Sequence, residues 1–438
     1  MMRYGAGAFF DFARYGASLR GEIAGGLTTF LTMSYIIAVN PAILHAAGIP
    51  EGPAITATIA TAVFGCLAMG LIANRPFAIA PYMGENAFVA YTVVRVMGVR
   101  WEVALGSVFI AGVLFALLTV AKIRSWMADA LPAGLSHSFA AGIGLFLAFI
   151  GLTESGLVIL GVPGAPVQVG NLASAHSIIA IGSFIAIAML MLWRVPGAIL
   201  LGIVAASIAA FASGVAHPPE HFVSLPPSLA PVLMHLDIAG ALGPGLFGVT
   251  LSIFVMALVD TMGSLIGVSA RAGFLDENGN LPEIERPMLA DALATIFAAL
   301  AGTTTSGAYI ESAAGVSAGA RTGLSAIVVA ALFAASLFFA PIVTAIPAVA
   351  YGPALIVVGA MMLASVRHID FDDMSELIPA FSVIALMSFT FNIGLGVTAG
   401  LILYPLFKLA ASRADEVRPG LWVLAGLSTL FFILYPWR

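Results

Sequence analysis

Apolar stretches long enough to cross a lipid bilayer follow one another along nearly the whole chain. A hydrocarbon core about 30 Å thick needs roughly 20 apolar residues per helix. Hydrophobic residues make up 61% of the 438 residues and charged residues only 9%, whereas about half apolar is usual in a soluble domain. This pattern excludes a soluble globular protein. It predicts an all-α polytopic membrane protein, because a helix satisfies its own backbone hydrogen bonds in lipid.

The apolar stretches predict fourteen transmembrane segments. Three of them are shorter or interrupted, and Pro81 and Gly84 fall inside the third segment. A Gly-Thr-Thr-Thr-Ser-Gly run opens the tenth. Because Pro and Gly do not favour the interior of a helix, the third and tenth segments are expected to be broken. In chain order the segments lie at 22–46, 54–74, 76–97, 101–122, 137–155, 174–193, 196–213, 247–270, 287–301, 305–320, 323–346, 351–366, 378–394 and 396–411.

The basic residues predict the orientation of these segments, because Lys and Arg are enriched in cytoplasmic loops. With a cytoplasmic N-terminus, only Arg95 and Arg100 fall outside, and the 214–246 connection, which has no Lys or Arg, also falls outside. We therefore expect a multi-pass protein of the cell (inner or plasma) membrane with its N-terminus in the cytoplasm. Fourteen basic residues fall inside: Arg3, Arg14, Arg20, Arg75, Lys122, Arg124, Arg194, Arg271, Arg286, Arg321, Arg367, Lys408, Arg413 and Arg418.

Three acidic residues stand out inside the apolar segments, where a bilayer does not readily accept them, whereas most of the other 19 lie in polar connections or near the ends of the segments. They are Glu85, Asp260 and Glu311, and their neighbours are Gly, Ser, Thr and Tyr. An ionised carboxylate at the bilayer centre costs roughly 2.5–3.5 kcal/mol on insertion scales unless it meets a partner, a proton or water. Such residues usually mark the path of a transported substrate or ion. The sequence therefore predicts a polar site inside the membrane.

The chain also shows an internal duplication. The string LPAGLSHSFAAGIGLF at 131–146 has a counterpart 215 residues later, IPAVAYGPALIVVGAM at 346–361. Asn40 in the first segment is matched by Asp260 in the eighth, and Glu85 in the third by Glu311 in the tenth. Because each unit would hold an odd number of segments, seven, the two units must insert with opposite orientation. Interrupted segments at matching places in inverted halves indicate the substrate site of a transporter.

This duplication predicts how the chain is divided. We expect a cytoplasmic N-terminus (1–21), a first repeat with segments 1–7 (22–213), an extracytoplasmic connection (214–246) and a second repeat with segments 8–14 (247–411). A C-terminal tail (412–438) follows. It holds an apolar stretch at 420–436 that either spans the membrane or lies along its surface.

The two acids of the second repeat are expected to couple substrate binding to proton binding. A half-helix beginning near Ala308 would direct its positive N-terminal end at the site. Glu311 would lie in its first turn, where the ionised form is favoured. Asp260 lies in the middle of an apolar segment, where burial favours the protonated form.

Several long strings in the chain resemble the AzgA-type purine permeases of the nucleobase–cation symporter class. The resemblance extends from the first to the thirteenth segment, so it covers nearly the whole chain. The matching strings are GEIAGGLTTFLTMSYIIAVNPAIL at 21–44, MGENAFVAY at 83–91, VDTMGSLIGV at 259–268, LPEIERPMLADALATIFAALAGTTTSGAYIESAAGVSAGARTGLSA at 281–326 and HIDFDDMSELIPAF at 368–381.

The resemblance implies a fold and a function. The fold would have fourteen segments as two inverted sets of seven, arranged as a core domain and a gate domain. The function would be proton-coupled uptake of hypoxanthine, guanine or adenine, with no cofactor. The substrate acids carried over from the family are Asp260 and Glu311, and the polar residue of the third segment is Asn86. The partners would be a purine nucleobase, a proton and the lipid bilayer, with a homodimer as a further option and no nucleic acid.

Aromatic and acidic neighbours complete the predicted substrate site. A purine offers ring N–H groups as donors, which suit carboxylate acceptors, and its flat ring suits the side chain of Tyr309, Tyr82 or Phe88. The chain departs from the family pattern in the third segment, where it reads YMGENA in place of the usual GMGLNA. The departure adds Tyr82 and Glu85. This extra carboxylate is expected at the edge of the site, where it would influence which purine is preferred.

Two other classes of function remain as alternatives. A carrier of anions or other small solutes would share the inverted-repeat fold, but its site should present a basic residue or bare helix N-termini. An intramembrane enzyme would need a catalytic constellation, and the sequence offers no Ser/His or metal-binding spacing for one. Asp370, Asp372 and Asp373 resemble a metal-binding acidic cluster, but a second cluster of matching spacing is lacking, so a solvated loop is expected there.

Overall fold

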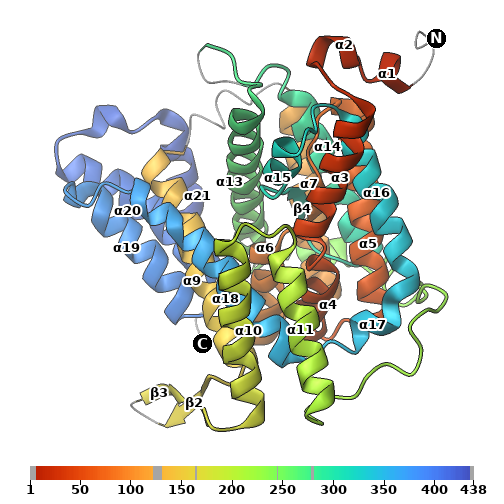
Figure 1. Ribbon diagram of the computed structural model, residues 1–438. Helices are drawn as coiled ribbons and strands as arrows, with labels where there is room; N and C mark the ends of the chain where they lie inside the picture. Colours follow the sequence, from red (N-terminus) through yellow and green to blue (C-terminus); the bar gives the residue numbers. More distant parts are fainter. Residues whose placement is uncertain (1–5, 122–130, 163–164, 244, 278–280, 435–438) are drawn as a thin grey trace.

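The computed structural model describes residues 6–121, 131–162, 165–243, 245–277 and 281–434, and the protein is mostly helical (Figure 1). Arg3, Lys122 and Arg124 of the expected cytoplasmic set, and the last four residues of the expected tail, lie outside the described residues. The helices of the first half are α1 (Ala6–Phe9), α2 (Phe12–Tyr15), α3 (Leu19–Met33), α4 (Ile36–Ala46), α5 (Glu51–Ala68), η1 (Met69–Ala73), α7 (Trp101–Val120), α9 (Ala133–Glu154), α10 (Ala175–Leu192) and α11 (Ala198–Ala212).

The second half continues in the same way. Its helices are α12 (Ile238–Ala241), α13 (Phe247–Ala272), α14 (Glu285–Ala301), α16 (Gly323–Ser336), η3 (Leu337–Phe339), α17 (Ala340–Thr344), α18 (Ala348–Leu363), η4 (Ala364–His368), α19 (Met374–Phe389), α20 (Ile393–Ala410), η5 (Ala414–Glu416) and α21 (Pro419–Leu434).

Nine helical stretches among the described residues are long and apolar enough to cross a membrane. The protein is therefore a multi-pass membrane protein. Of the other predicted segments, those at α11 and α19 are shorter apolar helices, and the apolar stretch of the tail forms α21. The structure thus supplies full-length helices for part of the predicted fourteen segments, and the third and tenth are broken.

Both broken segments begin with a short β-strand, which corrects the all-α prediction. In the third segment, β1 (Ile79–Pro81) leads into α6 (Met83–Ala87) and the π-helix η2 (Phe88–Val96). In the tenth, β4 (Ser306–Ala308) leads into α15 (Ser312–Ser317). A residue before Pro favours extended backbone, and β-branched Thr residues favour strands, so the sequence around each strand suits this conformation.

The strands β1 and β4 pair antiparallel, although more than 200 residues separate them in the chain. Ile79 lies opposite Ala308, and Pro81 lies opposite Ser306. The half-helix expected near Ala308 therefore starts later, at Ser312, because Ala308 belongs to the strand. A second pair, β2 (Val158–Val162) with β3 (Ala165–Val169), forms an exposed hairpin.

The helices pack as two sets. The first set consists of α3–α7 and α13–α16, and the second set consists of α9–α11 and α18–α20. Figure 1 shows α13 near the centre of the molecule, with α19 and α20 on one side and α3 and α16 on the other. The duplicated strings form α9 and α18, which begin after Pro132 and Pro347 and pack against each other. A Cβ added to Gly144 would lie 2.6 Å from the Gly359 carbonyl oxygen, so this contact requires glycine.

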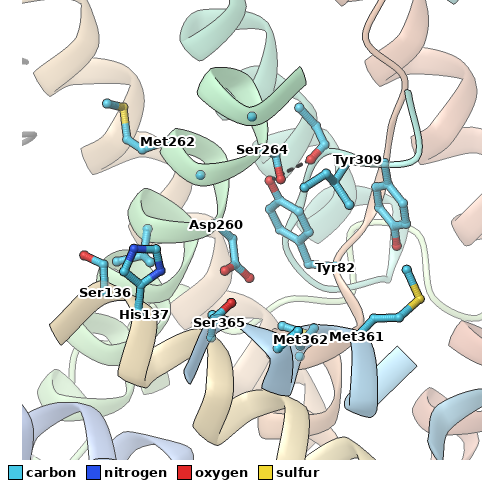
Figure 2. Close-up of a pocket in the computed structure, with 18 of the residues that line it drawn as sticks. Tyr82, Ser136, His137, Asp260, Met262, Ser264, Tyr309, Met361, Met362 and Ser365 are labelled. Carbon is cyan, nitrogen blue, oxygen red and sulfur yellow. Dashed lines mark hydrogen bonds between the residues drawn. The ribbon is translucent and has the colours of Figure 1, made fainter. Parts of the chain in front are cut away.

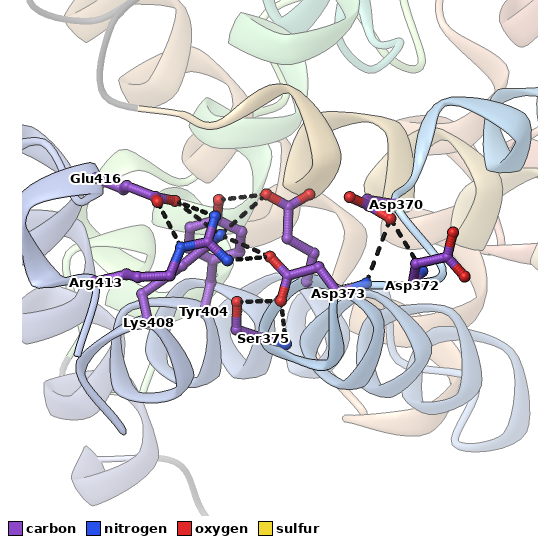
Figure 3. Close-up of polar contacts among 9 residues, drawn as sticks. Asp370, Asp372, Asp373, Ser375, Tyr404, Lys408, Arg413 and Glu416 are labelled. Atoms are coloured by element: carbon purple, nitrogen blue, oxygen red, sulfur yellow. Dashed lines mark hydrogen bonds and ion pairs between the residues drawn. The ribbon is translucent and has the colours of Figure 1, made fainter. Parts of the chain in front are cut away.

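A network of charged residues joins α19, α20 and η5 (Figure 3). The Lys408 side chain is fully buried, and its Nζ lies 3.2 Å from both Asp373 and Glu376 and 3.0 Å from Glu416. Hydrogen bonds from Ser375, together with the nearby guanidinium group of Arg413, hold the pKa of Asp373 well below its usual range. A buried cation needs such partners, because an unpaired charge removed from water is costly.

Candidate functional site

A cavity of about 830 Å³ lies between the two helix sets. Its walls come from α13, from the strand–helix junctions of the broken third and tenth segments, from the first turns of α9 and from the end of α18 with η4. Most of the lining side chains are apolar, including Leu258, Met262, Val358 and Met362. A largely apolar cavity of roughly 300–1,000 Å³ with a few polar groups is typical of a small-molecule site.

Two of the acids that the sequence singled out face this cavity. Asp260 lies on α13, and Figure 2 shows its carboxylate directed into the space between Tyr82 and His137. Glu311 lies just before α15 and is held from behind, because the Tyr35 hydroxyl donates a 2.8 Å hydrogen bond to its Oε1. Both residues are partly exposed, and both line the cavity. The structure thus brings together two acids that are 51 residues apart in the chain.

Two tyrosines form one wall of the cavity. The rings of Tyr82 and Tyr309 are nearly parallel, at 12°, with centroids 6.1 Å apart. Each hydroxyl donates to the carbonyl oxygen of the residue that precedes the other tyrosine, Tyr82 to Ala308 and Tyr309 to Pro81. Tyr82 also needs Gly307, since a Cβ there would lie 2.3 Å from its ring. The β1–β4 pair therefore fixes both rings as a flat, rigid surface.

The other three predicted site residues do not line the cavity. Glu85 is fully buried behind it, where its Oε2 accepts a 3.2 Å hydrogen bond from Thr305. Asn86 is also fully buried, and its amide donates to the side chain of Asn40. Phe88 packs elsewhere, close to Gly394. A direct contact between any of these three residues and a substrate remains a prediction.

Several residues at the site were not singled out from the sequence. Tyr35 lies in the short break between α3 and α4, and its partner Glu311 is 276 residues away. Asp291 lies on α14, is 1% exposed, and accepts a hydrogen bond from the Thr261 hydroxyl. Asp291 could have been singled out from the sequence, because it is an acid inside the predicted 287–301 segment. Nothing in the local sequence indicated that Tyr35 pairs with Glu311.

The basic groups of the cavity lie on α9 and η4. The rings of His137 and His368 lie 4.8 Å apart, and Arg367 Nε lies 3.1 Å from His368 Nε2. Among the described residues, no ion pair involves Asp260 or Glu311. No group of three or more potential metal ligands occurs in that part of the chain either. The site therefore presents carboxylate acceptors beside aromatic rings.

Comparisons with known proteins agree with this architecture. The model of a permease family, Xan_ur_permease, matches residues 20–402. A guanine/hypoxanthine permease of Bacillus subtilis, PbuO, is 42% identical over 95% of this chain and 97% of its own length. An adenine permease of Escherichia coli, AdeP, is 38% identical over 97% of this chain and 94% of its own. The transmembrane domain of a cyanobacterial bicarbonate transporter, BicA, is similar in fold, with a TM-score of 0.62 at 16% identity over 87% and 97% of the two chains.

These findings agree on the class of protein. The similar proteins are named as permeases or transporters, and the cavity lies among membrane-spanning helices. The chain is accordingly a membrane transporter rather than an enzyme, and it belongs to the permease family whose model it matches from residue 20 to residue 402.

Proposed function

We propose that the protein takes up purine nucleobases (hypoxanthine, guanine or adenine) across the cell membrane, coupled to the entry of protons. The observation that carries this proposal is the pairing of two carboxyl groups, Asp260 and Glu311, with the flat tyrosine wall of a largely apolar cavity. The relatives named as guanine/hypoxanthine and adenine permeases support the substrate class.

The chemistry of a purine suits these groups. A neutral purine presents N–H donors at its edge and two apolar faces. An ionised carboxylate only accepts hydrogen bonds, so Glu311 would bind an N–H group at the edge of the ring, whereas protonated Asp260 would donate its O–H group to the base. Tyr309 and Tyr82 would contact a face of the ring, as in offset aromatic stacking. Glu85 and Asn86 would act from behind the cavity wall, by positioning α6.

The electrostatics of the site support proton coupling. A carboxyl group inside a membrane needs a proton, a nearby cation or water. No ion pair to Asp260 or Glu311 occurs among the described residues. In the proposed cycle Glu311, held by Tyr35, binds substrate, while Asp260 gains and loses the coupled proton. Proton entry would then drive accumulation of the substrate.

The topology that we propose has fourteen segments in two inverted sets, 22–213 and 247–411, joined by an extracytoplasmic 214–246 connection. The first helix set would be the core domain and the second the gate domain. The matched positions of the two strands that open the broken segments support this division. Residues 1–21 and the basic loops would be cytoplasmic, and the tail at 412–438 would follow the last segment.

In this topology the cavity faces the cytoplasm. The first turn of α9 and the end of α18 line it, and both would lie on the cytoplasmic side. On the opposite side, the hydroxyl groups of Tyr91 and Tyr351 each donate a 3.1 Å hydrogen bond to Glu154. Tyr91 belongs to the proposed core domain, and Glu154 and Tyr351 belong to the proposed gate domain. Their contact would close the outer side in an inward-facing state.

The test is uptake of radiolabelled purines by cells that lack their own purine permeases. We expect accumulation that unlabelled purines compete for and that a protonophore abolishes. The Asp260→Asn variant should lose accumulation but keep exchange of substrate across the membrane, because an amide resembles the protonated acid in shape. Uptake of bicarbonate or another inorganic anion, with no uptake of purine, would instead support the anion-carrier alternative and overturn the proposal.

A further inference from the structure

The cavity holds three basic side chains that the proposed binding of a purine base does not use. Arg367 and His368 lie on η4, and His137 lies in the first turns of α9. We call these three residues the basic set. Among the described residues that line the cavity, all the basic side chains belong to this set.

The positive charge of the basic set has no partner among the described residues. No ion pair in that part of the chain includes Arg367, whose Nε–H group donates to Nε2 of His368. Its two terminal nitrogen atoms form no hydrogen bond there. The rings of His137 and His368 lie 4.8 Å apart, so they repel each other when both carry a proton. A bound anion would offset this charge.

The acids closest to the basic set in the chain have other partners or lie in solvent. Asp370 accepts hydrogen bonds from the backbone N–H groups of Asp372 and Asp373. Asp372 is exposed and does not line the cavity. Asp373 and Glu376 both pair with Lys408. The anion that suits the basic set therefore has to come from a ligand.

The kinds of donor in this part of the cavity are those that recognise phosphate. A guanidinium group forms paired hydrogen bonds with phosphate oxygens, and a protonated imidazole donates from both nitrogen atoms. Ser136 and Ser365 are sequence neighbours of the basic set and also line the cavity. Their hydroxyl groups form no hydrogen bond with another described residue, so both can donate to a ligand.

The same cavity contains the acids of the proposed base site, and this combination restricts the ligand. Figure 2 shows Ser136 and His137 on one side of Asp260 and the ring of Tyr82 on the other. A neutral purine has no group that needs a cation, and an inorganic anion would leave Asp260 and Glu311 unmatched. A purine that carries a phosphate group through a ribose suits both sets, and a cavity of about 830 Å³ is within the range for ligands of that size.

We propose that the basic set binds the phosphate group of a purine nucleoside monophosphate, whose base occupies the site of the transported purine, and that this nucleotide inhibits transport from the cytoplasm. The inference rests on the proposed function and on its topology, in which the cavity faces the cytoplasm. A cell that has converted enough imported base into nucleotide would thereby slow further uptake.

The position of the basic set explains why the nucleotide inhibits and is not carried. The contacts for the base lie on α13 and on the two broken segments, in the proposed core domain. The basic set lies on α9 and η4, in the proposed gate domain. A bound nucleotide would therefore join the two domains and oppose the movement between them that transport requires. Its charged phosphate would also be costly to carry through the membrane.

The first experiment measures how competitors displace a radiolabelled purine from the purified, detergent-solubilised protein at constant pH and ionic strength. The competitors are the nucleoside of that purine, its monophosphate and inorganic phosphate. One hydrogen bond to a charged group changes an affinity by roughly 10–150-fold. We therefore expect the monophosphate to compete at least about tenfold more strongly than the nucleoside, and inorganic phosphate alone to leave the purine bound. Equal competition by nucleoside and monophosphate would overturn the inference.

The decisive variant is Arg367→Gln, which removes the charge of an exposed side chain. Its monophosphate should compete no better than its nucleoside, while its affinity for the base stays within about twofold of the wild type. Arg367→Lys keeps the charge without the planar group and should recover part of the advantage. An advantage that persists in full in Arg367→Gln would overturn the inference.

The matched control is Arg271→Gln. Arg271 is also exposed, forms no ion pair among the described residues and lies on the proposed cytoplasmic side, but it does not line the cavity. This variant should keep the wild-type preference for the monophosphate. An equal loss in Arg271→Gln and Arg367→Gln would assign the effect to general surface charge and overturn the inference.

A second experiment tests inhibition and separates this inference from the proposed function. In proteoliposomes with the monophosphate on both sides, exchange of labelled base should slow in the wild type and much less in Arg367→Gln; entry of labelled monophosphate would overturn the inference. Direct binding of labelled base and labelled monophosphate is measured in parallel. Binding of the base alone would overturn the inference and leave purine uptake intact, whereas a protein that binds neither would contradict the proposed function itself.

Discussion

Replacement of Glu22 should destabilise the protein more than replacement of any exposed acid, because this side chain joins two distant parts of the chain. Glu22 lies on α3 and is fully buried. Its carboxylate accepts hydrogen bonds from the backbone N–H groups of Arg321 (2.9 Å), Thr322 (3.0 Å) and Ser325 (3.1 Å), where α16 begins. The first N–H groups of a helix have no partner within the helix, so Glu22 supplies one from another segment.

The expected loss can be worked out from these three bonds. A hydrogen bond to a charged group contributes about 1.5–3 kcal/mol, so three of them give an upper bound of roughly 4–9 kcal/mol. The true value is lower, because bonds that share one carboxylate are not additive. Glu22→Ala leaves three buried donors without a partner. Glu22→Gln keeps one oxygen for two of them but turns its own N–H₂ group toward the third.

The assay measures the unfolding of the detergent-solubilised protein during heating or during titration with a denaturant. We expect the midpoints to fall in the order wild type, Glu22→Gln, Glu22→Ala. Glu51→Gln is the matched control, because Glu51 also lies at the start of a helix but is half-exposed, and its midpoint should stay near that of the wild type. A Glu22→Ala protein as stable as the control would refute the reasoning.

Three further predictions concern the site, the proposed outer closure and pH. Glu311→Gln should abolish or strongly weaken purine uptake in a protein that still inserts and folds, because an amide presents a donor where the substrate needs an acceptor; wild-type kinetics would contradict this. Tyr91→Phe removes a hydrogen bond to Glu154 worth about 1.5–3 kcal/mol and should therefore open the outer side more often. A cysteine placed at Ser264 in the cavity should then react faster with an impermeant maleimide added outside. An unchanged rate would exclude the proposed closure. The lowered pKa of Asp373 stabilises the fold above about pH 4, the usual unfolded value, and this contribution is lost as pH falls further. The unfolding midpoint should drop there, and less so in Asp373→Asn.

The local sequence predicted those parts of the fold that local chemistry determines. Apolar runs identified a membrane protein, and the Pro and Gly residues near Pro81 and Gly302 located the two broken segments. Asp260 and Glu311 stood out because lipid makes any acid conspicuous, and the structure places both at one cavity. The resemblance to a permease family agrees with the family that the chain matches.

The features that were missed depend on contacts between distant residues. The strands β1 and β4 have three residues each and exist because they pair across the fold, so neither carries a strand pattern of its own. Tyr35 and Glu22 become important only through partners in the tenth segment and at the start of α16, about 280–300 residues away. Asp291 was visible in the sequence, but its hydrogen bond with Thr261 on another helix was not.

The antiparallel pairing of β1 with β4 restricts how this site can change over evolution. Successive residues of a strand point to opposite faces, so one inserted residue would turn every side chain beyond it to the other face. Here such an insertion would carry Tyr82 or Tyr309 out of the wall and would move the start of α6 or α15 as well. Many proteins acquire new ligands by lengthening a loop. This transporter cannot do so at these two segments, and new specificity must come from exchange of single side chains on a backbone of fixed length.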